Sequence, residues 1–213
     1  MTMSRVRPIL AALGASICIA ACSGDSSSRG PAATSPTAPD SFRVALETTK
    51  GTIAVDVIRA WSPRGADRFK ELVDAGYFND VAFFRVVPGF VAQFGMNGDP
   101  STNRRWEERS IPDDPPRQSN ARGTIVFATA GPNTRANQLF INLVDNRRLD
   151  PMGFAPIGRV VEGMQVVDSL FDGYGEAPDQ SQISRQGNKY LKAEFPLLDY
   201  VKSARVVGPT QTP

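Results

Sequence analysis

The side chains best suited to chemistry in this sequence are an arginine, several amides and a set of aromatic rings, concentrated in two segments. Residues 83–93 read FFRVVPGFVAQ, and residues 127–141 read FATAGPNTRANQLFI. The 213-residue chain has no histidine, which excludes Ser-His-Asp triads, Cys-His dyads and zinc sites with imidazole ligands. Its two cysteines, Cys18 and Cys22, lie near the N-terminus, so neither a disulfide nor a thiol nucleophile is expected in the folded part.

Both segments resemble the cyclophilin family. The first is similar to the family's F-H-R-(apolar)-(apolar)-P-G-F-(apolar)-x-Q strand, and the second to its M-A-N-A-G-P-N-T…S-Q-F-F-I loop and strand. Further matches follow in the family's order, including AGYF at residues 75–78 and IGRVVEGM at residues 157–164. The resemblance covers roughly residues 42–170. It implies a mainly β fold, a closed eight-stranded antiparallel β-barrel capped by two α-helices, and peptidyl-prolyl cis-trans isomerase activity in a groove on its outer surface.

The implied reaction is rotation about an X-Pro amide, and no bond has to break. Its barrier of roughly 18–20 kcal/mol comes from resonance between nitrogen and carbonyl. A catalyst needs a donor for a pyramidal prolyl nitrogen, a dry pocket for the proline ring and polar groups that hold the flanking peptide. By the match, Arg85 would direct its permanently charged guanidinium at that nitrogen, and Gln93 would bind the substrate carbonyl and orient Arg85. Taken alone, Arg85 would be interpreted as a strand arginine in a surface salt bridge.

The same resemblance implies a set of substrate-binding residues. The side chains that match the proline pocket are Phe90, Val91, Phe140 and Leu149. Ala128 and Thr129 would offer backbone groups to the substrate. Gln138 would flank the neighbouring subsite, and Phe154 stands in place of a groove histidine. Without the motifs, the apolar members would be interpreted as ordinary core residues.

Several positions depart from the family pattern and leave two functions open. Val91 replaces the usual Met, Thr129 the usual Asn, and Arg148 the Trp of cyclosporin-sensitive members. We therefore expect catalysis with a shifted substrate preference and weak cyclosporin binding, which a submicromolar dissociation constant would contradict. The alternative is a binding module for Pro-containing segments with little turnover. A passive envelope lipoprotein is the third possibility, and it would have no affinity for peptides.

The N-terminal residues predict export and a lipid anchor. Arg5 and Arg7 precede an apolar run over residues 9–21 that is short for a bilayer span, as in a secretory signal peptide at 1–21. The sequence IAAC at residues 19–22 resembles the bacterial lipobox, which would make Cys22 the lipidated first residue of the mature protein; an ordinary signal with an incidental cysteine is the other interpretation. Residues 22–40 are rich in Ser, Pro and Ala and predict a disordered tether. We expect a membrane-anchored lipoprotein on the periplasmic side of the envelope, with the outer membrane favoured by Ser23.

The periodicity of apolar residues outlines the domain that must position the groove, residues 41–208, followed by a tail at 209–213. It predicts an opening hairpin, a helix from Ser62 to Gly76 and a second helix around Met164. Further strands are expected at residues 81–87, 125–128, 139–143, 157–161 and 201–207. Residues 97–120 predict a long surface loop. Residues 172–196 are an insertion that either packs apolar patches onto the barrel or forms a rim that helps select substrates.

Composition limits the partners. Twenty-four Lys and Arg against 22 Asp and Glu give a net charge of +2, without the single-sign field that nucleic-acid binding requires. We expect a monomer without metal or cofactor, whose partners are Pro-containing polypeptides and, through the N-terminal lipid, a membrane. The expected role is to assist the folding of exported or envelope proteins.

Overall fold

The computed structural model describes residues 37–208 of the chain. The expected signal peptide at 1–21, the predicted lipidation site Cys22, the tether up to residue 36 and the tail at 209–213 lie outside the described residues. Ala38, near the end of the expected tether, is buried against the core, and its backbone N–H donates to Asp67 Oδ1 at 2.9 Å. Among residues 37–208, no helix is both long enough and apolar enough to cross a bilayer.

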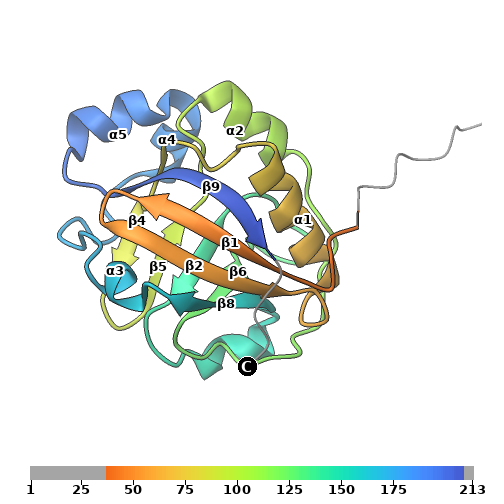
Figure 1. Ribbon diagram of the computed structural model, residues 1–213. Helices are drawn as coiled ribbons and strands as arrows, with labels where there is room; N and C mark the ends of the chain where they lie inside the picture. Colours follow the sequence, from red (N-terminus) through yellow and green to blue (C-terminus); the bar gives the residue numbers. More distant parts are fainter. Residues whose placement is uncertain (1–36, 209–213) are drawn as a thin grey trace, which may run out of the picture. The chain divides into compact units, whose positions relative to one another are not determined.

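One curled antiparallel sheet dominates the described residues, which confirms the mainly β fold (Figure 1). Its strand order is β3-β9-β1-β2-β8-β6-β7-β5-β4. The strands are β1 Ser41–Thr48, β2 Gly51–Ile58, β3 Val81–Ala82, β4 Arg85–Val87, β5 Val91–Phe94, β6 Thr124–Phe127, β7 Leu139–Asn142, β8 Pro156–Glu162 and β9 Tyr200–Gly208.

The hairpin of β1 and β2 shows how alternation selects the inner face of the sheet. Val44 pairs with Val55 and Leu46 with Ile53, and all four side chains are fully buried in the main core. Successive residues of a strand point to opposite faces, so these β-branched and leucine side chains share one face. The expected hairpin is therefore present, and it buries the face that its apolar pattern predicts.

The two edge strands of the sheet are consecutive in the chain. β3 ends at Ala82 and β4 begins at Arg85, so the single strand expected over residues 81–87 is divided at Phe83 and Phe84. Phe83 packs in the main core, whereas Phe84 packs in a second apolar cluster. Within residues 37–208 no ladder joins β3 to β4, and the chain itself bridges the two edges. Counting this bent segment once gives the eight strands expected; counted by their ladders, there are nine.

Helix α1 (Pro63–Asp74) begins where the sequence predicts, but Ser62 does not cap it through its own side chain. The Ser62 hydroxyl instead donates to Asp114 Oδ2 at 2.7 Å. The Asp114 carboxylate also accepts the backbone N–H of Gly65 at 3.0 Å and that of Arg64 at 3.3 Å. A residue from a distant segment thus satisfies donors that every helix N-terminus leaves open.

The long surface loop expected over residues 97–120 is wrong in part, because it contains helix α2 (Pro100–Glu107). Asp99 caps this helix by accepting the backbone N–H groups of Ser101 and Thr102. Its carboxylate also accepts the hydroxyls of Thr102 and Ser101, and these side-chain bonds, with the backbone bonds, lower the pKa of Asp99 to about 2. Its one buried residue is polar: the Asn103 side chain accepts from Tyr77 Oη at 3.0 Å. Since the helix buries an amide, the sequence carries no apolar periodicity to reveal it.

The insertion folds into two short helices. Helix α4 (Gln180–Gln186) lies beside α2, and α5 (Asn188–Glu194) lies beside α4 (Figure 1). Helix α3 (Met164–Asp168) is the second helix that the sequence predicts. Two buried side chains of the insertion, Ile183 and Leu191, pack with Phe84 and Met96 of the barrel. The expected packing of apolar patches onto the barrel is therefore confirmed.

A close backbone approach fixes the insertion against the start of α2. The Asn188 N–H donates to the Gly98 carbonyl at 2.9 Å. Gly187 has a φ of +57°, and a Cβ there would lie 1.9 Å from that same carbonyl oxygen. Only glycine fits this junction between α4 and α5.

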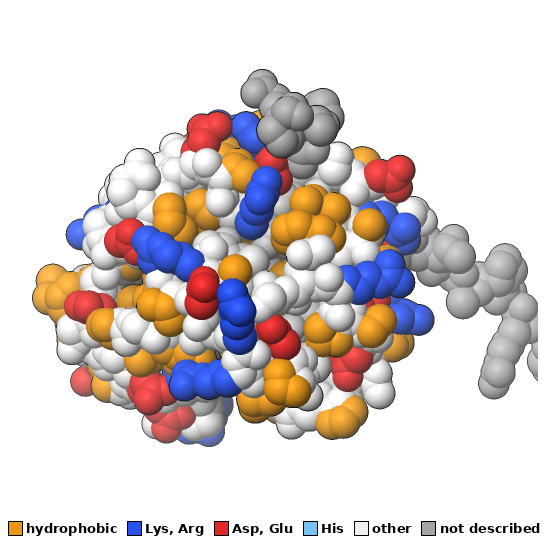
Figure 2. Space-filling view, turned by 90° about the horizontal axis from the view of Figure 1, so that it is seen from below, with side chains coloured by type: hydrophobic (Ala, Val, Ile, Leu, Met, Phe, Trp, Pro, Cys, Tyr) orange, Lys and Arg blue, Asp and Glu red, His pale blue; other side chains and the backbone are white. Residues whose placement is uncertain are grey.

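On the face of the molecule shown in Figure 2, basic and acidic side chains of the described residues are interspersed with separate apolar patches.

Candidate active site

Strand register brings the predicted catalytic residues into one row. Arg85 of β4 pairs with Gln93 of β5, Gln93 pairs with Phe140 of β7, and Phe140 pairs with Val126 of β6. Cross-strand partners project from the same face of a sheet. Four strands therefore align a guanidinium, an amide and two apolar side chains across one surface.

This row lies on the outer face of the curled sheet. Its neighbours along the strands, Ala92 and Ile141, belong to the main core inside the barrel. Val91, Val126, Phe140 and Leu149 form a separate buried cluster, against which Phe90, Ala128 and Phe154 pack. Strand alternation thus produces two apolar clusters from the same strands, one that fills the barrel and one that lines a groove outside it.

The Arg85 guanidinium is held from two sides. Its Nη1 donates to Gln93 Oε1 at 3.1 Å. Its Nε donates to Glu176 Oε1 at 2.7 Å, and its Nη2 donates to the same oxygen. Gln93 Nε2 in turn donates to Gln138 Oε1 at 2.9 Å. Gln93 therefore contacts the arginine that it was expected to orient, and a carboxylate from the insertion holds the opposite edge of the guanidinium.

An apolar cavity of about 270 Å³ lies directly beside this guanidinium. Phe140 and Phe154 meet there edge to face, with ring centroids 5.7 Å apart. Of the predicted site residues, the structure places nine in the wall of this cavity: Arg85, Phe90, Val91, Gln93, Ala128, Thr129, Phe140, Leu149 and Phe154. The tenth, Gln138, lines an adjoining cavity of about 490 Å³, which shares Gln93, Ala128 and Thr129 with the first.

A short 3₁₀ helix, η1 (Arg147–Met152), forms one wall of the apolar cavity. The Asp150 carboxylate fixes it by accepting from Ser119 Oγ at 2.6 Å and from the Asn120 backbone N–H and side chain, each at 2.8 Å. Burial alone would raise the pKa of Asp150, but these hydrogen bonds outweigh burial and lower it. Asn120 also donates to the carbonyl of Phe154 at 2.9 Å. One carboxylate–amide pair thus positions both Leu149 and Phe154.

The loop that follows β6 forms the opposite wall and is bonded to itself. Thr129 Oγ1 lies 2.8 Å from Thr134 Oγ1, and it accepts the N–H of Gly131 at 3.1 Å. The Ala128 N–H already donates to the Gln138 carbonyl at 2.9 Å. A backbone contact with a substrate would therefore fall to the Ala128 carbonyl and to the backbone of Thr129, whose side chain is turned into its own loop.

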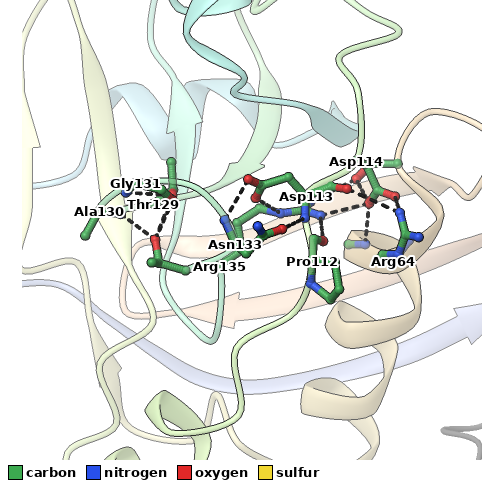
Figure 3. Close-up of polar contacts among 12 residues, drawn as sticks. Arg64, Pro112, Asp113, Asp114, Thr129, Ala130, Gly131, Asn133 and Arg135 are labelled. Carbon is green, nitrogen blue, oxygen red and sulfur yellow. Dashed lines mark hydrogen bonds and ion pairs between the residues drawn. The ribbon is translucent and has the colours of Figure 1, made fainter.

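A polar network supports this loop from behind (Figure 3); it is exposed at Asn133, partly exposed at Asp113 and buried at Arg135 and Asp114. Asn133 and Asp113 exchange two hydrogen bonds, of 2.7 and 2.9 Å. The guanidinium of Arg135 donates to Asp114 Oδ2 at 3.1 Å and to Ser62 Oγ at 3.2 Å, and the side chains of Arg135 and Asp114 are each only 2% exposed. Burial alone would raise the pKa of Asp114, but hydrogen bonds from Ser62 and Gly65 and the charge of Arg135 lower it below the usual value. The loop is thereby tied to the N-terminus of α1.

Three further residues at the site were not identified from the sequence as functional. Met152 lines the apolar cavity although its side chain is largely exposed. The guanidinium of Arg148 lies 4.6 Å from the centre of the Phe90 ring, and that of Arg85 lies 5.5 Å from it. Glu176, which binds Arg85, is 91 residues away in the sequence and belongs to no motif. Only Arg148 gave a signal, as a departure from the family pattern.

Comparison with known proteins identifies the family. Residues 43–187, more than half of the chain, match the family described as cyclophilin type peptidyl-prolyl cis-trans isomerase/CLD. The chain belongs to the cyclophilins. Peptidyl-prolyl cis-trans isomerase A of Dickeya dadantii is 32% identical over 138 residues, covering 62% of this chain and 73% of that protein. A peptidyl-prolyl cis-trans isomerase of Acinetobacter baylyi is 31% identical over 135 residues, covering 60% and 70%.

Solved structures support the same architecture. A cyclophilin type peptidyl-prolyl cis-trans isomerase of Cryptosporidium parvum superposes with a TM-score of 0.59 at 22% identity, covering 81% of this chain and 99% of that one. Cyclophilin AquaCyp293 of Hirschia baltica gives a TM-score of 0.58 at 17% identity, covering 81% and 76%. These solved structures confirm the fold, while the family match and the two bacterial relatives confirm the isomerase activity that the motifs implied, with proline-containing peptides as the substrate class.

Proposed function

We propose that this cyclophilin accelerates rotation about X-Pro bonds with Arg85 as its main catalytic residue, and that it assists the folding of exported or envelope proteins. The observation that supports the catalytic role is the placement of the Arg85 guanidinium beside an apolar cavity, oriented by Gln93. A proline ring in this cavity would bring its nitrogen next to a permanent positive charge.

The catalytic effect on the X-Pro bond would come from the N–H groups of Arg85 that are not used by other residues of the protein. Within the described residues, three of the five N–H groups of Arg85 donate to Gln93 and Glu176, which leaves two for a substrate. A hydrogen bond to the prolyl nitrogen competes with amide resonance, because it stabilises the lone pair on a pyramidal nitrogen. The interaction strengthens as the bond twists and therefore lowers the barrier rather than merely binding the substrate. The apolar walls lower the local dielectric and strengthen the effect of the charge.

The flanking peptide would be held by the groups around the two cavities. Phe90, Phe140 and Leu149 would enclose the proline ring, while Gln93 would bind the carbonyl that precedes it. The backbone at Ala128 and Thr129 would take an extended segment as a neighbouring strand, and Gln138 would contact the preceding side chain in the adjoining cavity. With one side of the peptide fixed and the other free, the enzyme permits rotation about a single bond.

The catalytic role is tested by cis-trans exchange on an Ala-Pro tetrapeptide, measured by NMR with the purified chain. We expect fast exchange that falls by about 10²- to 10³-fold in Arg85→Ala, the size of effect typical for loss of one preorganised donor. Arg104→Ala, which removes an exposed arginine on α2, is the matched control and should leave exchange unchanged. Peptide binding without exchange in the wild type would favour the alternative, a binding module for Pro-containing segments.

The cellular role rests on the N-terminal sequence. The apolar run and the IAAC pattern that ends at Cys22 support export and lipidation, and attached acyl chains would retain the domain at a membrane. We expect radiolabelled palmitate to label the wild type but not Cys22→Ser, and the label to fractionate with envelope membranes. Unlabelled wild-type protein in the soluble periplasm would contradict the anchor, and cytoplasmic protein would contradict the role in folding exported proteins.

A further inference from the structure

The insertion brings a carboxylate to the catalytic arginine. Glu176 Oε1 accepts from Nε of Arg85 at 2.7 Å and also from its Nη2. These two donors form the side edge of the planar guanidinium, whereas Gln93 binds Nη1. Three fixed N–H groups determine both the position and the plane of the guanidinium, and so the direction of the remaining two.

Glu176 is exposed, but the backbone on either side of it is anchored. The turn that carries it is closed by hydrogen bonds from the Gly175 N–H to the Asp172 carbonyl and from the Ala177 N–H to the Tyr174 carbonyl, each 2.9 Å long. The Tyr174 ring lies between two phenylalanine rings, with centroids 4.9 Å from Phe171 and 5.1 Å from Phe195. The position of this carboxylate is therefore set by the fold of the insertion.

The other end of the turn is anchored as well. Pro178 is buried, and Asp179 caps α4 by accepting the N–H of Ser181 at 2.7 Å. Beyond α4, Asn188 and Lys192 each bond the Asp80 carboxylate, at 2.9 and 2.8 Å. Because both flanks of the turn are fixed to the barrel, the insertion forms a support on the side of Arg85 that strand register does not reach.

We infer that Glu176 is a positioning residue, through which the insertion holds Arg85 in the orientation needed to act on the prolyl nitrogen. This inference rests on the catalytic role proposed for Arg85. Without partners, the Arg85 side chain would populate several rotamers. The Arg148 guanidinium, 4.6 Å from the centre of the Phe90 ring, would also repel the Arg85 guanidinium, which lies near the same ring. The carboxylate counteracts both effects without occupying the cavity, since Glu176 is absent from its wall.

The test is to measure kcat and KM for the wild type, Glu176→Ala and Glu176→Gln in the full chain. We expect Glu176→Ala to lower kcat by about three- to tenfold with KM changed less than twofold, because misplacement of a catalytic group weakens transition-state contacts while the apolar cavity still binds proline. Glu176→Gln keeps the accepting Oε1 and should recover at least half of the wild-type kcat. Glu194→Ala, which removes an exposed glutamate on α5 of the same insertion, is the matched control and should change neither constant.

A spectroscopic measurement separates positioning from a general effect on folding. The Nε–H resonance of Arg85, assigned by its loss in Arg85→Ala, should exchange slowly in the wild type and in Glu194→Ala. It should shift and exchange rapidly in Glu176→Ala. An active wild type whose kcat is unchanged or raised in Glu176→Ala overturns the inference, as does an unaltered Nε–H resonance. An inactive wild type would overturn the proposed function itself, so the two failures are distinguished.

Discussion

The two partners of Arg85 come from regions that are built differently. Gln93 lies on the neighbouring strand, is nearly buried, and is placed by a ladder whose register also fixes Phe140. Glu176 lies in an irregular turn 91 residues away, and its side chain is 64% exposed. One side of the guanidinium is thus held by sheet geometry and the other by a solvent-facing contact.

This difference has an energetic consequence. Exposed ion pairs contribute little to stability, about 0–1 kcal/mol, because solvent screens them. Buried polar networks are costly to break, because the remaining partner stays desolvated. We therefore expect changes on the buried side to affect both folding and catalysis, and changes in the insertion turn to affect mainly the catalytic rate.

The largest expected effect is at Asp114, in the buried part of the network behind the groove loop. Asp114→Asn removes the only buried carboxylate that contacts Arg135 among the described residues, and leaves this 2%-exposed guanidinium with the partly exposed carboxylate of Asp113, 3.3 Å from its Nε. Loss of one partner from a buried charge pair costs about 3–5 kcal/mol, so the free energy of unfolding in urea should fall by that amount. Asp113→Asn is the matched control, because Asp113 is 39% exposed, and it should cost no more than about 1 kcal/mol. Equal costs for the two variants would contradict the distinction between buried and exposed pairs.

The pH dependence of stability provides a second, smaller test of the same carboxylate. The folded protein lowers the pKa of Asp114, so the folded state binds fewer protons than the unfolded state below about pH 4. The contribution of Asp114 is therefore complete above that pH and lost as the pH falls further. Between pH 5 and pH 2, the unfolding free energy of the wild type should fall more steeply than that of Asp114→Asn, by at most about 1.4 kcal/mol per pH unit. Parallel curves for the two proteins would show that Asp114 does not contribute to acid sensitivity.

Gln93→Ala interrupts the row of side chains at its centre. It removes the acceptor of Arg85 Nη1 and the donor to Gln138, and leaves a small gap beside Phe140. We expect kcat/KM to fall by about tenfold, since Arg85 and Glu176 remain in place and orientation is lost only in part. Gln186→Ala, which removes an exposed glutamine of α4, should have no effect. If Gln93→Ala has less effect than Glu176→Ala, the buried partner is not the dominant one.

The sequence was informative wherever residue type alone decides the local structure. The Phe83–Gln93 and Phe127–Ile141 segments identify the family, and strand alternation then separates the groove residues Phe140 and Val91 from the core residues Ile141 and Ala92. Phe154, placed in the groove because it stands in place of the family's histidine, does line the cavity. These positions follow from period-two geometry and an established motif.

The features that were missed depend on contacts between distant residues. Helix α2 was expected to be loop because its buried side chain is Asn103, which carries no hydrophobic signal. The start of α1 at Ser62 was predicted, but not that Asp114 satisfies the open donors of this helix from across the fold. The Glu176–Arg85 contact joins an exposed turn to a strand, and no local pattern marks it. Local rules predict elements and faces, but not which distant polar group completes them.

The smallest expected effect tests whether the fold of the insertion, rather than the carboxylate alone, positions Arg85. Tyr174→Ala removes the ring between Phe171 and Phe195 that anchors the turn, while Glu176 itself is retained. The turn should become more mobile, so that Glu176 meets Arg85 for less of the time and kcat falls by about two- to threefold. Tyr174→Phe keeps the ring and should retain the wild-type kcat. Both variants are compared well below their unfolding temperatures, because loss of ring packing also lowers stability. A Tyr174→Ala enzyme with wild-type kcat would mean that the carboxylate finds Arg85 without help from the aromatic anchor.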